Sequence, residues 1–481
     1  MARATTYTIE QQPNQVAGDN NPQIFVLKES AGAITGADKF RYIAQVFIND
    51  VEKVKLKIHK NKAGVAIIDV HKIVRSFLET QENAQIEDPS GTFTIQTGIK
   101  GSIHAIGCNT TTKPFSSNTS QLTKVTIKAG YENATSATTA PTETLDKANY
   151  TYVSIVAGTP FTQTDTNEGG LDIDGVNYPL NNYLPTDNTR KFLTNSPYKQ
   201  FVRGSGTSAD NKDLLTIGFV QEGNLVTDGV PIVRIYVVYY NSSGGVINTH
   251  YFVNELAGGG IATADDVKNH LLYFGCGTKN LETQTDVSAA KPSDASNNGW
   301  AYYKVYGADG SGNAKTNSYY FYRYGQTISG SDTPDDRHQS CTRYDNVRLA
   351  WRNRLGCWDY MNFRGKSQEK VDFTSSQMER VPGTWDNATY NYDNWDRGKK
   401  TIYTEAVKTT ILNSDFLNEE ESAWLEELFT STNVHIVNDD FTIMPVVIKD
   451  KSYIKKTSVN NKVKLQYIIN LEHANKINTN S

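Results

Sequence analysis

The sequence predicts a mainly β protein with several domains: two β-sandwich modules of the immunoglobulin or fibronectin type and a C-terminal α+β domain. The chain has 481 residues, which is too long for a single hydrophobic core. Its apolar residues recur in short alternating runs that are separated by turn-forming residues, as in β-strands. With 38% hydrophobic and 21% charged residues, the composition is that of a globular protein.

Residues 1–131 are expected to form the first sandwich together with a short helix. The helix is predicted from one apolar face made by Val70, Ile73, Val74, Phe77 and Leu78. The strands are expected at 24–27, 40–48, 54–58, 93–97 and 125–128. Residues 132–191 are rich in Thr, Asn and Ser and show little periodicity, so we expect a surface loop or insertion there.

Residues 192–335 are expected to form the second sandwich. Its strands are predicted at 214–220, 232–240, 246–253, 270–274, 300–306 and 318–324. The sequence Asn-Ser-Ser-Gly-Gly at 241–245 is typical of a hairpin turn between two of these strands.

Residues 336–481 are expected to form the α+β domain and to mediate oligomerisation. Asn418 and Glu421 match a capping box, and Trp424, Leu425 and Leu428 make an apolar stripe after it, which predicts a helix. Strands at 401–412, 434–437, 443–448 and 463–471 surround that helix. This order suggests one helix packed on a small sheet or a split barrel.

The aromatic segment 347–363 predicts a hairpin at the start of this domain. Its Trp and Phe residues are expected in the core. Arg348, Arg352 and Arg354 concentrate positive charge there, and we expect them to contact another subunit or an anion. Ion pairs within the chain, with Asp345 or Asp359, are an equally good explanation.

Charge and hydropathy exclude several partners. The net charge of −4 gives no field that would attract nucleic acid, and no apolar run approaches the length of a membrane span. The polar N-terminal residues favour folding in a cytoplasm. The four cysteines lie far apart, so we expect buried free thiols, with a Cys341–Cys357 disulfide as the less favoured alternative.

No motif supports catalysis, a metal site or a cofactor. The eight histidines lack helical metal-ligand spacing, and a nucleophile elbow and a complete phosphate-binding loop are both missing from the sequence. We therefore predict that the chain is not an enzyme and uses no cofactor. The 27 Tyr and 6 Trp residues keep glycan binding or cleavage open, because aromatic rings stack on sugars and paired carboxylates hydrolyse them.

Several short motifs resemble virion structural proteins of marine and Bacteroidota-infecting tailed phages. They are Ile-Glu-Gln-Gln-Pro at 9–13, Phe-Arg-Tyr-Ile-Ala at 40–44, Gly-Val-Ala-Ile-Ile-Asp-Val at 64–70, Phe-Leu-Thr-Asn-Ser-Pro at 192–197, the segment 351–363 and Trp-Leu-Glu-Glu-Leu-Phe at 424–429. The resemblance spans most of the chain without the Thr-rich segment. It implies a role in assembly and supplies no catalytic site, and the C-terminal element order is also similar to tail-tube-type domains.

The leading hypothesis is thus a tail or baseplate component located in the virion and assembled in the host cytoplasm. It would form a homo-oligomer around the tail axis and contact other virion proteins. The main alternative is a fibre or adhesin that binds host-surface glycan through the second sandwich, residues 210–330. A polysaccharide depolymerase is the third possibility.

Overall fold

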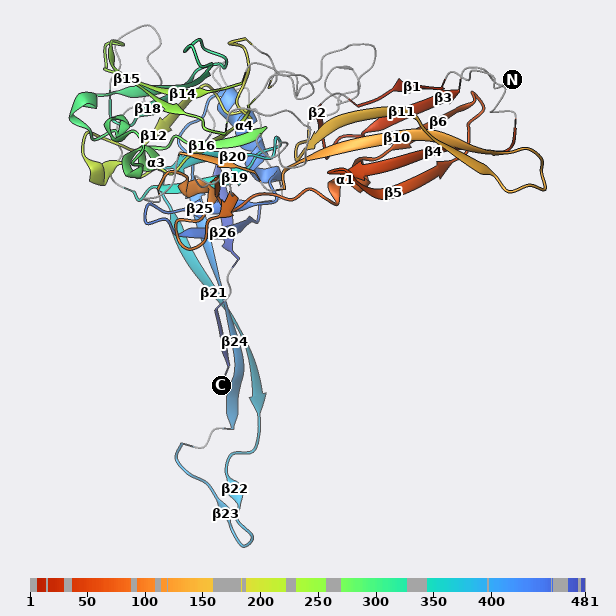
Figure 1. Cartoon of the computed structure of the whole chain (residues 1–481). Helices are drawn as coiled ribbons and strands as arrows, with labels where there is room; N and C mark the ends of the chain where they lie inside the picture. Colours follow the sequence, from red (N-terminus) through yellow and green to blue (C-terminus); the bar gives the residue numbers. More distant parts are fainter. Residues whose placement is uncertain are drawn as a thin grey trace, which may run out of the picture. The chain divides into compact units, whose positions relative to one another are not determined.

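The computed structural model describes residues 7–13, 16–29, 37–87, 93–108, 114–118, 120–158, 183, 187–221, 231–256, 270–326, 344–395, 398–450, 452, 466–474 and 477–480. The chain divides into two compact units. The first unit comprises Met1–Gln339 and Arg352–Asp359, and the second comprises Ser340–Trp351 and Tyr360–Ser481. Both are β-rich, so the chain is a mainly β protein of several sheets, as predicted (Figure 1).

The first sandwich has two sheets in the order β1-β3-β6 and β2-β11-β10-β4-β5. The strands are β1 (Tyr7–Gln11), β2 (Val16–Gly18), β3 (Ile24–Glu29), β4 (Asp38–Ile48), β5 (Val51–Ile58), β6 (Val65–Asp69), β10 (Leu122–Ala134) and β11 (Thr142–Ile155). Alternate residues of both sheets, such as Phe25, Tyr42 and Ile127, meet in one core. The short helix α1 (His71–Arg75) follows β6 and buries Val74, while Phe77 is exposed.

Strand β11 corrects the predicted loop at 132–191. Residues 142–155 pair with β10 along its length, and Tyr152 and Val153 are fully buried. The prediction was wrong because the first half of β11 is polar. Glu143, for example, is exposed on the outer face of the sheet, where polar residues are satisfied and a loop-like composition is compatible with a strand. Residues 159–182 of the predicted loop lie outside the described part of the chain.

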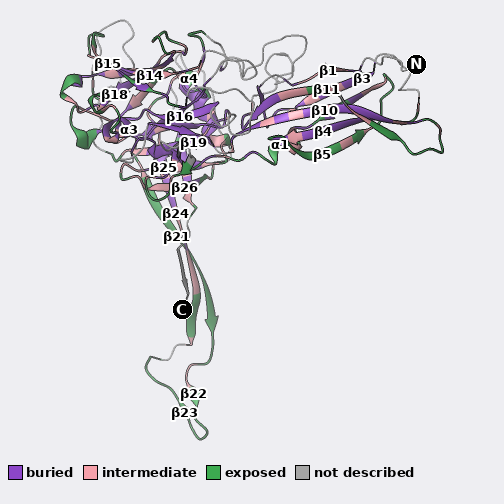
Figure 2. Ribbon diagram, viewed as in Figure 1, coloured by how far each residue is buried: buried purple, intermediate pink, exposed green. Residues whose placement is uncertain are grey.

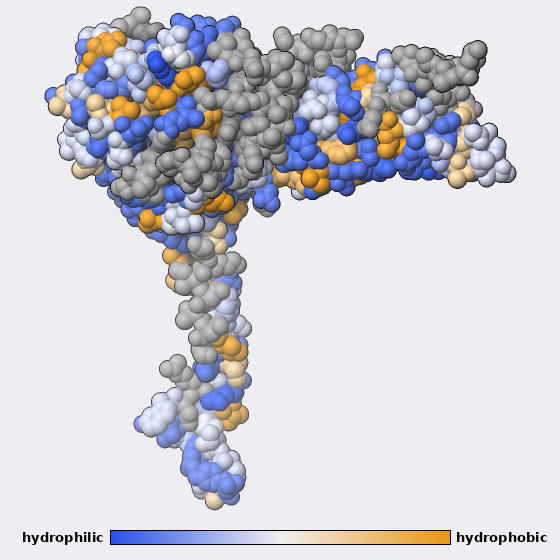
Figure 3. Space-filling model, in the orientation of Figure 1, coloured by the Kyte–Doolittle hydropathy of each residue, from blue (hydrophilic) through white to orange (hydrophobic). Residues whose placement is uncertain are grey.

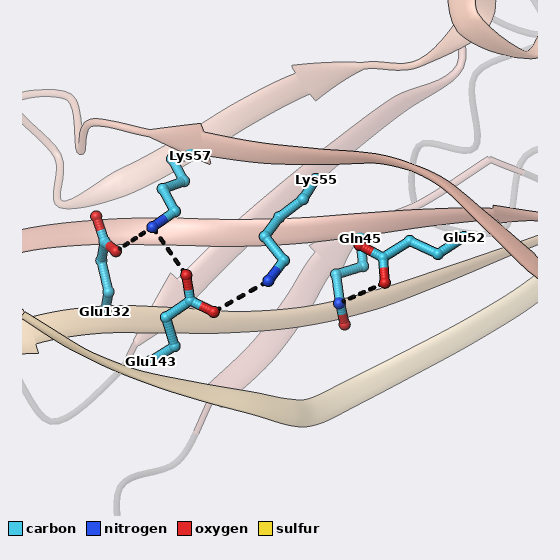
Figure 4. Close-up of polar contacts among 6 residues, drawn as sticks. All are labelled: Gln45, Glu52, Lys55, Lys57, Glu132 and Glu143. Carbon is cyan, nitrogen blue, oxygen red and sulfur yellow. Dashed lines mark hydrogen bonds and ion pairs between the residues drawn. The ribbon is translucent and has the colours of Figure 1, made fainter.

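Charged side chains hold that outer face together (Figure 4). Lys57 Nζ lies 2.6 Å from a carboxylate oxygen of Glu132 and 2.8 Å from one of Glu143, and Lys55 Nζ lies 3.0 Å from the other oxygen of Glu143. Hydrogen bonds from Lys57 and Lys55 lower the pKa of Glu143. The same network raises the pKa of Lys57, through Glu132 first and Glu143 second. Lys57 of β5 thus bridges Glu132 and Glu143, two like charges that lie opposite each other on β10 and β11.

The second sandwich also has two sheets, in the order β12-β18-β17-β14-β15 and β13-β16-β9-β7-β8. Its strands are β7 (Gln85–Glu87), β8 (Phe93–Ile95), β9 (Phe115–Ser117), β12 (Lys199–Val202), β13 (Thr216–Val220), β14 (Arg234–Tyr240), β15 (Val246–Val253), β16 (Leu271–Gly275), β17 (Tyr302–Ala308) and β18 (Tyr319–Arg323). Helix α3 (Thr278–Thr283) and the 3-10 turns η1 (Ile103–Ala105), η3 (Ser208–Asp210), η4 (Ser288–Ala290) and η5 (Ala295–Asn297) complete it. Phe252 and Phe274 meet between the sheets with ring centroids 5.3 Å apart.

The predicted domain boundary at residue 131 does not separate the two sandwiches, because part of the N-terminal segment belongs to the second one. Strands β7, β8 and β9 belong to the N-terminal 131 residues, yet β9 pairs with β16 of the second sandwich. The predicted strand at 93–97 therefore exists but lies in the other sandwich. The boundary at residue 131 also falls inside strand β10, whose Tyr131 pairs with Thr144 of β11. Local hydrophobic patterns reveal strands but not which distant strand each one pairs with.

The second unit has an eight-stranded sheet, a two-stranded sheet of β22 and β23, and a helix. Its strands are β19 (Val347–Arg352), β20 (Trp358–Phe363), β21 (Gln368–Glu379), β22 (Thr384–Trp385), β23 (Tyr390–Asn391), β24 (Lys399–Asn413), β25 (Val434–Val437), β26 (Ile443–Ile448), β27 (Ile468–His473) and β28 (Ile477–Asn480), with helix α4 (Glu419–Thr430). The sheet order is β20-β19-β25-β26-β27-β24-β21, with β28 beside β24. Leu425 and Leu428 of α4 are buried in a core with Leu349, Ile469 and Leu471.

The capping box of α4 is present as predicted. Asn418 Oδ1 accepts a hydrogen bond from the Glu421 amide at 2.8 Å, and the Glu421 carboxylate accepts one from the Asn418 amide at 3.0 Å. We expect Asn418→Ala to lower the free energy of unfolding by about 1 kcal/mol, because the Glu421 amide loses its partner. Asn418→Ser should retain most of the stability. Urea unfolding followed by circular dichroism measures both, and an Ala variant as stable as the Ser variant would contradict the capping role.

Three cysteines lie in the described residues, and all three are buried free thiols as predicted: Cys108, Cys276 and Cys357. The Cys341–Cys357 disulfide is therefore not formed, and Cys341 itself lies outside the described residues. Burial raises the pKa of Cys108 to about 11 and that of Cys357 to about 12. Both thiols stay protonated and poorly nucleophilic near neutral pH. No helix in the described part of the chain has the length and apolar character of a membrane span.

Candidate assembly interface

The predicted hairpin at 347–363 forms, and Asn353 organises its turn. Asn353 Oδ1 accepts hydrogen bonds from the amides of Leu355 and Cys357, both at 3.0 Å. Its Nδ2 donates to the Leu193 carbonyl at 2.9 Å and to Asp359 Oδ1 at 3.1 Å. Gly356 adopts φ +80°, which a residue with a Cβ rarely tolerates. The turn 352–359 is thus a rigid, hydrogen-bonded part of the first unit.

The tryptophans of this segment are core residues, as predicted. In the second unit, Trp351 is fully buried and packs against Trp424 of α4, with ring centroids 4.9 Å apart. In the first unit, Trp358 is buried against the His104 ring, 4.6 Å away, and its Nε1 donates to the Gln81 carbonyl at 3.4 Å. These rings therefore stabilise the fold and are not free to contact another molecule.

The structure corrects the assignment of Arg348 to an exposed subunit interface. Only 2% of Arg348 is exposed, and its guanidinium lies over the Tyr360 ring at 5.3 Å. We assumed one buried and one exposed face for β19. The strand is instead buried on both faces: Leu349 and Trp351 pack in the core with α4, and Arg348 on the other face lies against Tyr360.

Arg352 and Arg354 belong to the first unit and are half-buried, so the three arginines do not form one exposed cluster. Burial lowers the pKa of Arg352, and Tyr273 and Asp19 oppose that shift. The backbone carbonyl of Arg354 accepts a hydrogen bond from the Gly158 amide at 2.6 Å. An interface role for Arg352 and Arg354 stays a prediction. Asp359, a predicted ion-pair partner of these arginines, accepts a hydrogen bond from Thr194 Oγ1 at 2.6 Å.

The most exposed apolar feature of the second unit is the long hairpin of strands β21 and β24, which the sequence did not predict. Strands β21 and β24 pair in register from Gln368–Ile411 to Glu379–Lys399. All 12 residues of β21 are exposed, and at ~3.3 Å per residue the strand is roughly 40 Å long. We call residues 368–408 the arm. Figures 1 and 2 show it extending from the rest of the second unit with its surface largely exposed.

The end of the arm, residues 380–398, carries a group of exposed aromatic residues. Strands β22 and β23 form a small hairpin there, and Asn387 in its turn has φ +56°. Trp385 is 68% and Trp395 is 77% exposed, and Tyr390 and Tyr392 are also exposed. Trp and Tyr at a projecting surface are the residue types that dominate protein interfaces. We call these four residues the aromatic tip.

The shaft of the arm also exposes apolar side chains (Figure 3). Val371, Phe373 and Ile402 are all exposed, and 71% of Phe373 is accessible. A two-stranded ribbon has no core of its own and is marginally stable unless another element covers it. In the described residues, β28 adds a third strand at β24 residues 403–406, and the outer edge of β21 has no strand partner.

The arm was missed because a strand is normally recognised by one buried face. Strand β21 has no buried face. Its alternation of Val371 and Phe373 with charged residues is too short to predict a strand. A usable signal was present in residues 385–395, where Trp and Tyr alternate with Asn, Asp and Thr. Such composition is typical of recognition loops.

The second sandwich presents a different aromatic surface, along β14, β17 and β18. Tyr236 stacks on Tyr306 with centroids 5.1 Å apart, and Tyr240 stacks on Tyr302 at 4.7 Å. Lys304 Nζ lies over the Tyr306 ring at 4.8 Å. Burial and neighbouring tyrosines raise the pKa values of Tyr302 and Tyr306. These rings stack on one another. The stacking stabilises the sheet and leaves few ring faces open for a sugar.

No group of three His, Cys, Asp or Glu side chains in the described residues could hold a metal ion. The buried carboxylates that we find are engaged in structural contacts, such as Asp213 with Arg203 at 2.6 Å and Glu282 with Asn211 at 2.8 Å. The arm, with its exposed apolar and aromatic side chains, is the candidate functional site.

No protein-family model matches this chain, and no curated protein matches it. Among solved structures, extracellular domains 3–5 of Drosophila OTK align over 85% of this chain and 93% of that chain, with 6% identity and a TM-score of 0.19. A mutant of Salmonella alpha-2-macroglobulin aligns over 98% of this chain and 38% of that chain, with 6% identity and a TM-score of 0.18. Such low scores carry no argument about this chain.

Proposed function

We propose that this chain is a structural component of a tailed-phage virion, in its tail or baseplate, and acts through homo- and hetero-oligomeric assembly. The observation that supports the proposal is the arm, because its apolar and aromatic side chains are exposed within the chain and suit burial against another subunit. The resemblance of the short motifs to phage virion proteins supplies the type of particle. Phage assembly in the host cytoplasm is consistent with buried, reduced thiols.

The glycan-binding alternative would use the second sandwich. Its tyrosine surface is the natural candidate, but Tyr236–Tyr306 and Tyr240–Tyr302 stack on each other. The aromatic tip of the arm has more accessible rings. Its location on a long ribbon of the unit expected to oligomerise favours a protein partner over a sugar.

The experiment is peptide mass spectrometry of virus particles purified from cells that express the chain. We expect its peptides in the particle fraction together with those of other virion proteins. The double variant Trp385→Ala/Trp395→Ala should remain folded, because both rings are exposed, and its copies per particle should fall by about tenfold or more, as expected for loss of two interface anchors. Ile99→Ala, an exposed apolar residue of the first unit, is the control and should be incorporated normally.

Two results would contradict the proposal. One is a chain that is absent from purified particles although it is expressed and folded. The other is a Trp385→Ala/Trp395→Ala variant incorporated as well as the Ile99→Ala control, which would remove the arm from assembly.

A further inference from the structure

The outer face of the sheet β12-β18-β17-β14-β15 in the second sandwich is covered by tyrosine rings. Residues that lie directly opposite each other on paired strands share a face, and Tyr302 lies opposite Tyr240 on one side and Tyr322 on the other. The registers place six tyrosines on this face: Tyr236, Tyr240, Tyr302, Tyr306, Tyr320 and Tyr322. Tyr239 and Tyr303 alternate with them in sequence and are fully buried on the core face. We call the outer surface the tyrosine face.

The rings of the tyrosine face stand side by side across the strands. Tyr240 and Tyr302 stack with an interplanar angle of 4°, and Tyr236 and Tyr306 with one of 6°. Their centroids are 4.7 and 5.1 Å apart, close to the spacing of ~4.8 Å between neighbouring strands. Each ring therefore covers a face of its neighbour. The ring edges and hydroxyl groups are what a ligand can reach.

The hydroxyl groups offer hydrogen-bond donors on this face. Tyr240, Tyr302 and Tyr306 are half-buried, and their hydroxyls make no hydrogen bond to another residue in the described part of the chain. Burial and neighbouring tyrosines raise the pKa values of Tyr302 and Tyr306, so both hydroxyls stay protonated at neutral pH. Hydrogen bonds to an ionised acceptor are the stronger ones, so an anionic group suits these donors best.

The tyrosine face also carries positive charge without a carboxylate beside it. Lys304 Nζ lies 4.8 Å from the Tyr306 centroid, and the Arg234 guanidinium lies 4.7 Å from the Tyr251 centroid. Lys199 of the edge strand β12 is exposed on the same face. None of the three cations forms an ion pair with a described residue, and the five strands contain no Asp or Glu. Their charge is therefore uncompensated in the described part of the sandwich.

The first sandwich shows the opposite arrangement on its own outer face. Lys55 and Lys57 contact Glu143 there (Figure 4). Arg41 and Lys57 contact Glu132. The chain thus neutralises the cations of one sheet face internally and leaves those of the other for a partner. A positive surface of this kind is complementary to a negative one.

We infer that the tyrosine face binds an acidic segment of another protein. Asp and Glu side chains of that segment would pair with Lys199, Lys304 and Arg234 and accept hydrogen bonds from the tyrosine hydroxyls. The stacked rings favour protein over nucleic acid or polysaccharide, because bases and sugars bind aromatic residues by stacking on open ring faces. Tyrosine edges and hydroxyls are typical of protein interfaces. The inference goes beyond the proposed function, since the face lies in the first unit and the arm in the second.

Fluorescence anisotropy of a fluorescein-labelled oligoglutamate peptide with the purified full chain at low salt tests this inference. We expect saturable binding to the wild type. The double variant Arg234→Gln/Lys304→Gln should raise the dissociation constant by about tenfold or more, because two cations leave the interface. The matched control Lys62→Gln/Arg75→Gln also removes one Lys and one Arg, from exposed positions of the first sandwich, and should bind like the wild type.

A second variant separates binding from folding. Tyr302→Phe/Tyr306→Phe keeps both rings and removes only the hydroxyls, so the sheet should remain intact, as circular dichroism can verify. Its dissociation constant for the peptide should rise by about threefold or more, because two donors to carboxylates are lost.

Three results would overturn the inference. They are a wild type that shows no saturable binding of the peptide, an Arg234→Gln/Lys304→Gln variant that binds as tightly as its control, and oligothymidylate or oligogalacturonate of the same charge that binds as tightly as the peptide. The Trp385→Ala/Trp395→Ala variant of the arm should bind the peptide like the wild type. Failure of this inference is thus distinct from failure of the assembly role, which is measured by incorporation into particles.

Discussion

Replacing Trp358 by alanine should lower the free energy of unfolding of the first unit by about 3–5 kcal/mol, the cost of emptying a large buried aromatic site. Only 3% of Trp358 is exposed. Its ring meets His104 edge-on, and its Nε1 donates to the Gln81 carbonyl. The substitution removes the ring contacts and leaves a buried carbonyl without this donor, so two costs add.

Urea unfolding followed by far-ultraviolet circular dichroism measures this effect. The matched control is Trp385→Ala, which removes the same side chain from the exposed tip of the arm and should change the stability of the isolated chain by less than about 0.5 kcal/mol. Equal effects of the two substitutions would mean that Trp358 does not belong to a packed core.

Replacing Gly356 by alanine should cost about 3 kcal/mol or more, because two penalties coincide. Gly356 has φ +80°, and a Cβ built there would overlap the carbonyl oxygen of Val156. The clash involves backbone on both sides, so rotation of a side chain cannot relieve it. We expect a lower unfolding temperature and weaker amide-exchange protection at Gly158, whose amide donates to Arg354 in the same turn.

Gly64→Ala is the control that measures the conformational penalty without the steric clash. Gly64 has the same φ of +80°, but nothing lies within 4 Å of a Cβ built there. Gly64→Ala should therefore cost only the conformational term, about 1–2 kcal/mol. If Gly356→Ala proves no more harmful than Gly64→Ala, the close approach of Val156 to the turn is wrong.

Local patterns in the sequence predicted the second sandwich and the C-terminal helix well. Strands β14 and β15 match the predicted runs within two residues, with the 241–245 turn between them. The Asn418 capping box is present. Each of these features depends on residues that are close in sequence, so alternation, turn residues and caps were enough to identify them.

Features set by distant contacts could not be predicted in this way. The polar half of β11 is a strand because Glu143 pairs with Lys55 and Lys57, which lie far away in the sequence. Arg348 is buried on a face that the sequence pattern predicts to be exposed, and it lies over the Tyr360 ring. Strand β21 lacks a buried face altogether. Of the candidate site, the sequence predicted an assembly role and did not indicate the arm, and it placed Arg348 at a surface although that side chain is buried.

The assignment of residues 352–359 to the first unit also sets an order of events during synthesis. This segment supplies the Gly356 carbonyl to Gln121, the Arg354 carbonyl to Gly158 and the Asp359 carboxylate to Thr194. Those partners emerge from the ribosome roughly two hundred residues earlier, and until then these hydrogen bonds cannot form. The first unit thus cannot complete its fold until translation has entered the second, so a ribosome that stops at residue 339 releases an incomplete sandwich instead of an independent domain.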